Sequence, residues 1–269
     1  MPQTFLITGA TDGIGLETAR RLAPAGHTLL LHGRSREKLD RVAGELRAIP
    51  GVGRSETFLA DFADLADVAR MARDIRANHD RIDVLINNAG VLKTSAPVTA
   101  DGMDVRFVVN TLAPALLTEA LLGVMTPDSR VITLSSAAQA SVDLDALSGR
   151  TRLADMDAYA QSKLAVTMWS AHMANRHGAA GPVFIAVNPG SLLASKMVKE
   201  GFGIAGKDIG IGADILVAAA TEPRFAAANG RYFDNDAGDF GPPHFDARDS
   251  GKTGAVTDRI HTLIDSYLA

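Results

Sequence analysis

Short apolar runs alternate with longer segments of helical periodicity along almost the whole chain, and this alternation restricts the possible folds more than any other feature. Strands are expected near 4–8, 27–32, 54–60, 82–87, 130–135, 183–188 and 231–234, and helices near 13–25, 35–48, 64–78, 101–125, 157–177, 208–220 and 254–267. Most of the apolar runs are continuous, which is typical of parallel strands with helices on both faces. The sequence therefore predicts an α/β fold with a doubly wound parallel sheet.

The composition excludes several classes of protein. The chain has 269 residues, of which 46% are hydrophobic, and its formal net charge is −4, so it can build a large core and shows no basic stretch for nucleic acid. It contains no cysteine, and its histidines lack metal-ligand spacing, so neither disulfides nor a metal site are expected. Because the N-terminus lacks signal-peptide features and every apolar run is shorter than the roughly 20 residues of a membrane span, we expect a cytoplasmic protein without a span.

A glycine-rich stretch, "TGATDGIG", follows the first predicted strand and opens the first predicted helix. Glycines at these places permit a sharp turn and let a diphosphate approach the backbone beside the positive end of the helix. A tight strand-to-helix turn without a ligand is the alternative. The stretch supplies the following candidate cofactor-binding residues: Gly9, Thr11, Asp12, Gly13, Ile14 and Gly15.

The end of the second strand bears on the choice of nucleotide. A site for NAD(H) places a carboxylate here for the ribose hydroxyls, whereas an arginine suits a 2′-phosphate. The sequence offers Gly33 and Arg34 but no acid, so NADP(H) is expected over NAD(H), with Ser35 as a helper hydrogen bond. Asp61 and Phe62 follow the third strand, where Asp61 is placed to bond the adenine edge or to cap a helix.

Polar residues also follow the fourth and fifth strands. In "NNAG", the residues Asn88, Ala89 and Gly90 suit a loop that passes close to a cofactor, although an Asx-type turn is the alternative. In "LSSAAQ", Ser135 and Ser136 lie at the carboxyl edge of the predicted sheet, where open α/β folds bind ligands. A serine there can donate a hydrogen bond to a substrate oxygen. The run lacks the Gly-x-Ser-x-Gly pattern of a serine hydrolase.

Tyr159 and Lys163 lie four positions apart in "DAYAQSKLA", so both side chains project from one face of a predicted helix. A fixed ammonium near a phenol favours the phenolate. Lowering the pKa of a phenol toward neutrality needs roughly 4 kcal/mol, which a lysine supplies only in a water-poor cleft with help from a positive nicotinamide ring. We therefore hypothesise that Tyr159 and Lys163 together carry out proton transfer.

Five motifs occur together in a fixed order: "TGATDGIG", "NNAG", the serine after the fifth strand, "YAQSK" and "NPG" at 188–190. In order and approximate spacing they resemble the classical short-chain dehydrogenases/reductases over nearly the whole chain. "LHGRSREKL" and "GRYFDND" are similar to the retinol-dehydrogenase-like group, which tends to use NADP(H). The resemblance implies one Rossmann-type dinucleotide-binding oxidoreductase domain over 1–269. Family members often pair through the helices that carry Asn110 and Tyr159, which leaves a homo-oligomer open.

The resemblance also implies a role for each matching residue. Tyr159 would be the general acid/base, Ser136 would polarise the substrate carbonyl, and Lys163 would bind the nicotinamide ribose and lower the pKa of Tyr159. Asn110 would anchor a water in the proton relay, unless it is a satisfied core residue. The remaining matches would serve the cofactor and the sheet: Gly9, Gly13 and Gly15 at the pyrophosphate, Asn87 in the sheet near the adenosine ribose, and Pro189 and Gly190 near the carboxamide.

Two departures from the family pattern affect this interpretation. The segment between Ser136 and Tyr159 is longer than in compact members and is expected to cover the substrate pocket. The family usually places a threonine four positions beyond the glycine of "NPG", whereas this chain has Ala194 there, followed by Ser195 as a candidate for the same hydrogen bond. Substrate specificity is expected to lie in the loops at 91–99, 137–158 and 191–210.

The sequence thus predicts an NADP(H)-dependent oxidoreductase that interconverts a carbonyl and an alcohol, with a small-molecule substrate and no nucleic-acid partner. Two alternatives stay open. One is a relative of the sugar-nucleotide epimerases and dehydratases, which share the tyrosine and the lysine. The other is a catalytically silent NADP(H)-binding sensor or scaffold. The glycine-rich and fairly apolar segment after "NPG" suggests a flap over a lipophilic carbonyl compound.

Overall fold

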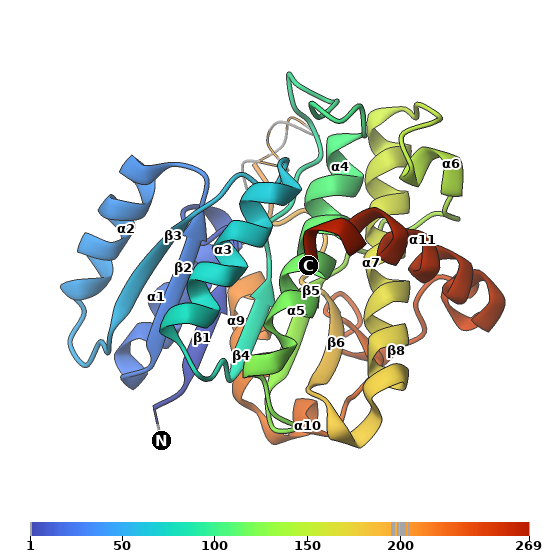
Figure 1. The fold of residues 1–269 in the computed structure, drawn as a ribbon. Coiled ribbons are helices and arrows are strands. Elements are labelled where there is room, and N and C mark those ends of the chain that lie inside the picture. Colours follow the sequence, from blue (N-terminus) through green and yellow to red (C-terminus); the bar gives the residue numbers. More distant parts are fainter. Residues whose placement is uncertain (1, 195–196, 198, 200–202, 204, 269) are drawn as a thin grey trace.

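One eight-stranded sheet forms the centre of the computed structural model, with the strand order β3-β2-β1-β4-β5-β6-β7-β8 (Figure 1). The structure describes residues 2–268 except 195–196, 198, 200–202 and 204. The strands are β1 Thr4–Ile7, β2 Thr28–Gly33, β3 Ser55–Leu59, β4 Val84–Asn87, β5 Arg130–Leu134, β6 Val183–Asn188, β7 Arg231–Asp234 and β8 Asp239–Gly241. The first seven are parallel and β8 is antiparallel to β7. The predicted doubly wound α/β fold is confirmed.

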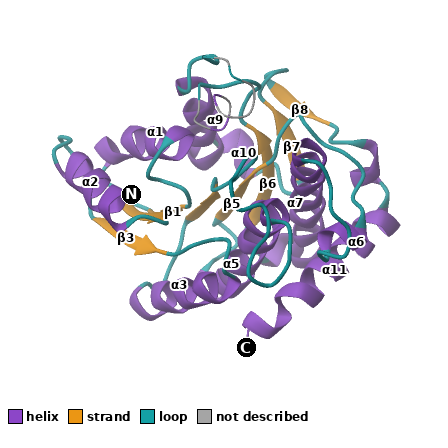
Figure 2. Cartoon of the chain, turned by 90° about the horizontal axis from the view of Figure 1, so that it is seen from above, coloured by secondary structure: helices purple, strands orange, loops and turns teal. Residues whose placement is uncertain are grey.

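Helices cover both faces of this sheet. They are α1 Gly13–Leu22, α2 Arg36–Arg47, α3 Leu65–Asn78, α4 Val105–Phe107, α5 Ala113–Leu121, α6 Leu144–Leu147, α7 Asp155–His177, α9 Gly210–Thr221, α10 Pro223–Ala226 and α11 Ser250–Leu268. Figure 2 shows α1, α2 and α9 on one side of the strands and α3, α5, α7 and α11 on the other. Burial of both faces explains why the strand sequences are continuously apolar.

Side-chain caps fix where several helices begin. Asp12, Ser35 and Asp64 are the N-caps of α1, α2 and α3, and each side chain accepts a backbone N–H of the first turn. The helix expected from residue 101 begins later because Asp104 caps α4 in the same way. From there, helical structure continues through a π-helical turn, Val108–Leu112, into α5.

This continuous helical stretch, Val105–Val124, is apolar and long enough to cross a membrane, judged by length and composition alone. In the fold, 72% of its most apolar window is buried against other parts of the protein. A core helix satisfies the same criteria, and the burial here is that of a core helix.

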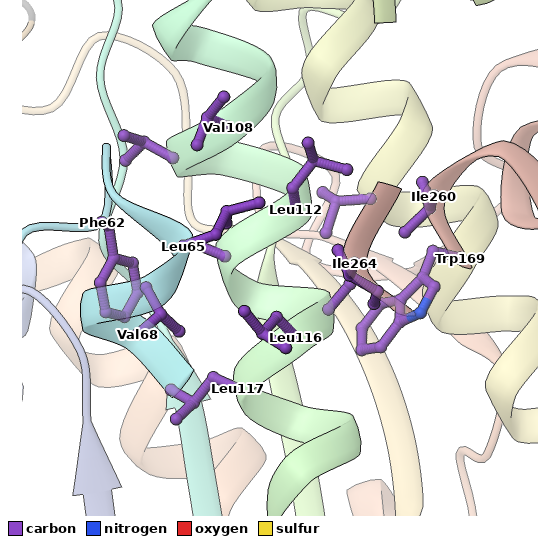
Figure 3. Close-up of a cluster of buried hydrophobic side chains, with 14 of the residues drawn as sticks. Phe62, Leu65, Val68, Val108, Leu112, Leu116, Leu117, Trp169, Ile260 and Ile264 are labelled. Carbon is purple, nitrogen blue, oxygen red and sulfur yellow. The ribbon is translucent and has the colours of Figure 1, made fainter. Parts of the chain in front are cut away.

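The larger core cluster lies between the sheet and the helices α3, α5, α7 and α11. Figure 3 shows Leu65 and Val68 of α3 turned toward the α5 stretch, and Ile260 and Ile264 of α11 beside Trp169 of α7. All of these side chains are almost completely buried. Helix α11 therefore covers the outer face of α5 and of α7, the helix that carries Tyr159.

Candidate active site

A cavity of about 750 Å³ opens at the carboxyl edge of the sheet, where the strand order changes direction between β1 and β4. Open α/β sheets bind ligands at this kind of position. Most of the predicted site residues line the cavity: Gly9, Thr11, Asp12, Gly13, Ile14, Arg34, Asp61, Phe62, Asn88, Ala89, Gly90, Ser136, Tyr159, Lys163, Pro189 and Gly190. The lining does not include Gly15, Ser35, Asn87 or Asn110, and Ser195 lies outside the described residues.

The glycine loop has no room for side chains at two of its positions. A Cβ on Gly15 would lie 2.4 Å from Asn88 Nδ2 and 2.5 Å from the carbonyl oxygen of Gly9. Gly9 itself has φ +65°, and a Cβ on it would lie 3.0 Å from the backbone of Ala89. The loop thus packs tightly on the end of β4 and presents bare backbone to the cavity beside the N-terminus of α1. This is the cradle that a dinucleotide pyrophosphate requires.

Two cations border the part of the cavity beyond β2. Arg34 is exposed and lines the cavity, and so does Lys38, whose Nζ lies 3.9 Å from Asp12 Oδ2. Lys38 was not predicted, although it follows Arg34 by one helical turn. Ser35 is directed elsewhere, because its Oγ accepts the backbone N–H of Lys38 as the cap of α2. Asp61 lines the cavity and does not cap α3, which is the role of Asp64.

His32 connects the ends of three neighbouring strands, a role that sequence reasoning missed. Its Nδ1 accepts the N–H of Gly9 at 3.3 Å, and its Nε2 donates to the carbonyl of Ala60 at 3.1 Å. These partners require the neutral imidazole with its proton on Nε2. The ring also stacks on Phe62 with centroids 4.1 Å apart. Burial lowers the pKa of His32 to about 4, so the ring stays neutral at ordinary pH.

The two asparagines of "NNAG" point to different places. Asn88 Nδ2 donates to the carbonyls of Thr8 at 2.7 Å and Gly9 at 3.2 Å, which ties the end of β4 to the glycine loop. Asn87 is buried, and its Nδ2 donates to Thr118 Oγ1 of α5 at 3.0 Å, away from the cavity. Asn87 thus links the sheet to a helix.

Asn110 uses its side chain to hold the backbone that follows "NNAG". Its Oδ1 accepts the N–H of Val91 at 2.8 Å, while its Nδ2 donates to the carbonyl of Val91 and to Ser162 Oγ. It lies in the π-helical turn, a local distortion that is frequent at functional sites. A Cβ on Gly90 would be 3.3 Å from Asn110 Oδ1 and 3.6 Å from Lys163 Nζ, so both the amide and the ammonium lie close to this glycine.

Ser136, Tyr159 and Lys163 come together at one end of the cavity. Ser136 and Tyr159 both line this end of the cavity, and the side chain of Ser136 is close enough to lower the pKa of the Tyr159 hydroxyl. Lys163 Nζ lies 5.8 Å from the centroid of the Tyr159 ring and donates to the carbonyl of Leu134 at 2.7 Å. The helix spacing of four residues thus puts the phenol and the ammonium on one face of α7, as the sequence predicts.

The electrostatics of this group differ from the expectation. Burial raises the pKa of Tyr159, and the nearby side chain of Ser136 opposes that rise only in part. Burial also lowers the pKa of Lys163 to about 8. Without the positive nicotinamide ring, burial dominates and the pKa of Tyr159 is raised on balance, so the lowering by Lys163 that the sequence implies stays a prediction.

A second layer of hydrogen bonds fixes the loop that carries Ser136. The carbonyl of Ser136 accepts from Gln139 Nε2 at 2.9 Å and from the hydroxyl of Tyr232 on β7 at 3.2 Å. Ser135 Oγ lies 2.6 Å from Thr167 Oγ1 on α7. Both serines line the cavity and are held by neighbouring elements, Ser135 through its hydroxyl and Ser136 through its carbonyl.

The wall on the other side of the cavity is mainly apolar. Its described lining includes Val91, Leu92, Met156, Leu192 and Met197 from the three loop regions expected to set specificity. Met156 and Leu192 are 41% and 42% exposed, so they stand at the mouth of the cavity. Among the described residues, no three His, Asp or Glu side chains are grouped closely enough to hold a metal ion.

Comparisons with known proteins agree with this geometry. A family model described as short chain dehydrogenase matches residues 3–202. Retinol dehydrogenase 13 of Homo sapiens is 35% identical over 193 residues, which are 70% of this chain and 58% of that protein. The match thus spans less than two thirds of this relative's length.

Solved structures give the same result for the fold. An uncharacterized protein from Mycobacterium paratuberculosis is 28% identical with a TM-score of 0.80, over 98% of this chain and 96% of that one. Landomycin C-6 ketoreductase LanV, solved with bound NADP and rabelomycin, is 27% identical with a TM-score of 0.68, over 87% of this chain and 94% of its own.

Proposed function

Because this chain belongs to the short chain dehydrogenase family, whose members are NAD(P)-dependent oxidoreductases, we propose that it is an NADP(H)-dependent carbonyl reductase. The observation that carries the proposal is that Ser136, Tyr159 and Lys163 line the same cavity as the glycine loop, with Lys163 Nζ 5.8 Å from the centroid of the Tyr159 ring. When bound, the nicotinamide supplies or accepts a hydride. The chain supplies the groups that bind the substrate oxygen and move its proton.

The raised pKa of Tyr159 favours the reduction direction. A phenol that keeps its proton at neutral pH is a general acid, and it can donate that proton to a carbonyl oxygen that becomes an alkoxide. Ser136 donates a hydrogen bond to the same oxygen and orients it. Lys163, whose pKa of about 8 lies near ambient pH, is suited to return a proton to Tyr159. Asn110 holds the loop beside Lys163 through its two bonds to Val91.

The preference for NADP(H) rests on Arg34 and Lys38, two cations at the edge of the cavity beyond β2. A 2′-phosphate there would gain two charge-assisted hydrogen bonds, whereas the bare hydroxyl of NAD(H) would gain neither. Parallel fluorescence titrations with NADPH and NADH test this directly. Tighter binding of NADPH is the expected result, and equal or weaker binding of NADPH would refute the cofactor preference.

For the substrate, we propose an extended apolar ketone or aldehyde, because Val91, Leu92 and Met156 give the cavity an apolar wall. Rates with NADPH on long-chain aldehydes and on small polar carbonyls test the proposal. A higher kcat/KM for the small polar compounds would refute the apolar substrate class. Tight NADPH binding without turnover of any carbonyl would instead favour a silent cofactor-binding protein.

A further inference from the structure

The loop Asn188–Ser191, which starts at the last residue of β6, lines the cavity and contains "NPG". Gly190 in this loop has φ +120°, a backbone conformation that favours glycine. Because glycine is flexible, other contacts must hold the loop in this conformation. The threonine that family members use in the next segment is replaced here by Ala194. The described part of the chain shows a different means of holding this loop.

Every residue of the loop is engaged by, or linked to, the turn Asp234–Asp236 that follows β7. Asn188 Nδ2 donates to Asp234 Oδ1 at 2.8 Å and to Asp236 Oδ2 at 2.9 Å, and the carbonyl of Asn188 accepts the N–H of Asn235. The carbonyl of Pro189 accepts from Asn235 Nδ2 at 2.9 Å. These bonds run between segments that are far apart in the sequence.

Asp236 completes the set at the far end of the loop. Its Oδ1 accepts the N–H of Ser191 at 2.9 Å, and its Oδ2 accepts the hydroxyl of Ser191 at 2.5 Å. Gly190, between these anchored residues, donates its N–H to Asn188 Oδ1 at 3.3 Å. Although burial acts to raise it, the pKa of Asp236 is lowered on balance by the bonds from Ser191 and Asn188 and by nearby Lys207, so the carboxylate stays charged.

We propose that Asp236 is a positioning residue that fixes the loop Asn188–Ser191 for the nicotinamide half of the cofactor, an inference that rests on the proposed function. The turn lies in the stretch "GRYFDND", beyond residues 3–202, which match the family model. Charged acceptors make stronger hydrogen bonds than neutral ones, and Asp236 gives one carboxylate to three donors. Small shifts of such a loop displace reacting groups, and misplacement costs rate steeply.

Asp236→Asn is the variant that tests this role. In either orientation, the new amide group turns an NH₂ toward a donor from Ser191 or Asn188. Asp239→Asn is the matched control, because this substitution removes the same charge from an exposed residue of β8. Among the described residues, the side chain of Asp239 bonds only the N–H of Phe240. The probes are NADP⁺ and adenosine 2′,5′-bisphosphate, which lacks the nicotinamide half.

We expect Asp236→Asn to weaken NADP⁺ binding about tenfold and to lower kcat by about 10- to 100-fold on a carbonyl that the wild type reduces. Binding of the bisphosphate stays within about twofold, because it uses only the adenosine side. The Asp239→Asn control behaves like the wild type. Ser191→Ala, which removes one of the three bonds, has a smaller effect and adds little to Asp236→Asn.

Wild-type affinities for both probes in the Asp236→Asn variant would overturn the inference while leaving the proposed function intact. Equal losses for NADP⁺ and the bisphosphate would also overturn it, because they indicate general damage to the site. A wild-type protein that binds neither probe would overturn the proposed function, and this inference with it.

Discussion

The buried ammonium of Lys163 makes the proposed catalytic site costly for the fold, and Lys163→Met measures that cost. The side chain is 4% exposed, and burial lowers its pKa from 10.5 to about 8. Below pH 8 the ammonium of Lys163 is therefore charged in both states, but it is buried in the folded protein and hydrated in the unfolded chain. The difference between the two pKa values corresponds to about 3 kcal/mol of unfolding free energy.

The sign of this effect follows from proton binding. Between pH 8 and 10.5 the unfolded chain binds more protons at this residue than the folded one, so the stability of the wild type rises with pH. Methionine has a similar length and no charge, and the variant lacks this rise. Lys163→Met also loses the hydrogen bond to the Leu134 carbonyl, worth about 1 to 3 kcal/mol. This loss shifts the unfolding free energy of the variant by the same amount at every pH and does not change the slope.

Urea unfolding at a series of pH values gives the required free energies, followed by the fluorescence of Trp169, the single tryptophan. We expect the wild type to gain about 3 kcal/mol relative to Lys163→Met from pH 8 to 10.5, and the difference to be flat below pH 8. Lys93→Met, which removes an exposed lysine, is the control for the loss of a lysine as such. If the unfolding free energies of the wild type and Lys163→Met changed in parallel with pH, the argument that burial lowers the pKa of Lys163 would be refuted.

Three further predictions address the proposed site. Tyr159→Phe should lower kcat for carbonyl reduction by at least about 100-fold and leave NADP⁺ affinity nearly unchanged, because only the proton donor is lost; near-normal turnover would exclude Tyr159 as the acid. Arg34→Asp should weaken NADPH binding about tenfold or more and spare NADH, as measured by titration; an unchanged NADPH/NADH ratio would dismiss the phosphate contact. The pKa of His32 is lowered from 6.5 to about 4, so the wild type should lose about 3 kcal/mol of unfolding free energy relative to His32→Gln as the pH falls from 6.5 to 4. Urea unfolding at several pH values measures this loss. Equal acid sensitivity of the two proteins would show that His32 does not titrate in that range.

The sequence predicts the seven parallel strands well because each is a continuous apolar run between helical segments. Strand β8 was missed because "DFG" is short, and its neighbours Ala237 and Gly238 are typical of a turn. The short helix α6 was missed for a similar reason, since "LDAL" contains a single helical turn. Its cap, Asp143, is a local signal that sequence analysis could have used.

The site residues that follow strands were predicted because topology brings the carboxyl ends of parallel strands to one edge. Residues that act through distant partners could not be found in this way. His32 looks like a lone histidine in a strand, and its role depends on Gly9 and Ala60, which come from two other strands. In the sequence, Asp236 is simply part of a polar turn. Its contacts with the loop Asn188–Ser191 arise only because β7 pairs with β6 in the fold.

The raised pKa of Tyr159 has a physical cause that could not be predicted from the sequence. Spacing on a helix gives proximity, but the balance between attraction and desolvation depends on burial, which depends on the whole fold. Ser35 was expected at the cofactor, yet its position directly before α2 made it the cap. The role of Ser195 stays a prediction.

The covering of α5 and α7 by α11 has a consequence for how the protein is made. Residues 250–268 are synthesised after all the elements they cover, so a nascent chain that ends before Ile260 and Ile264 leaves one side of Trp169 bare. Between the synthesis of α7 and that of α11, this apolar face stays uncovered, and exposed hydrophobic surface favours aggregation. The core between the sheet and α5 and α7 is therefore complete only after α11 has been synthesised.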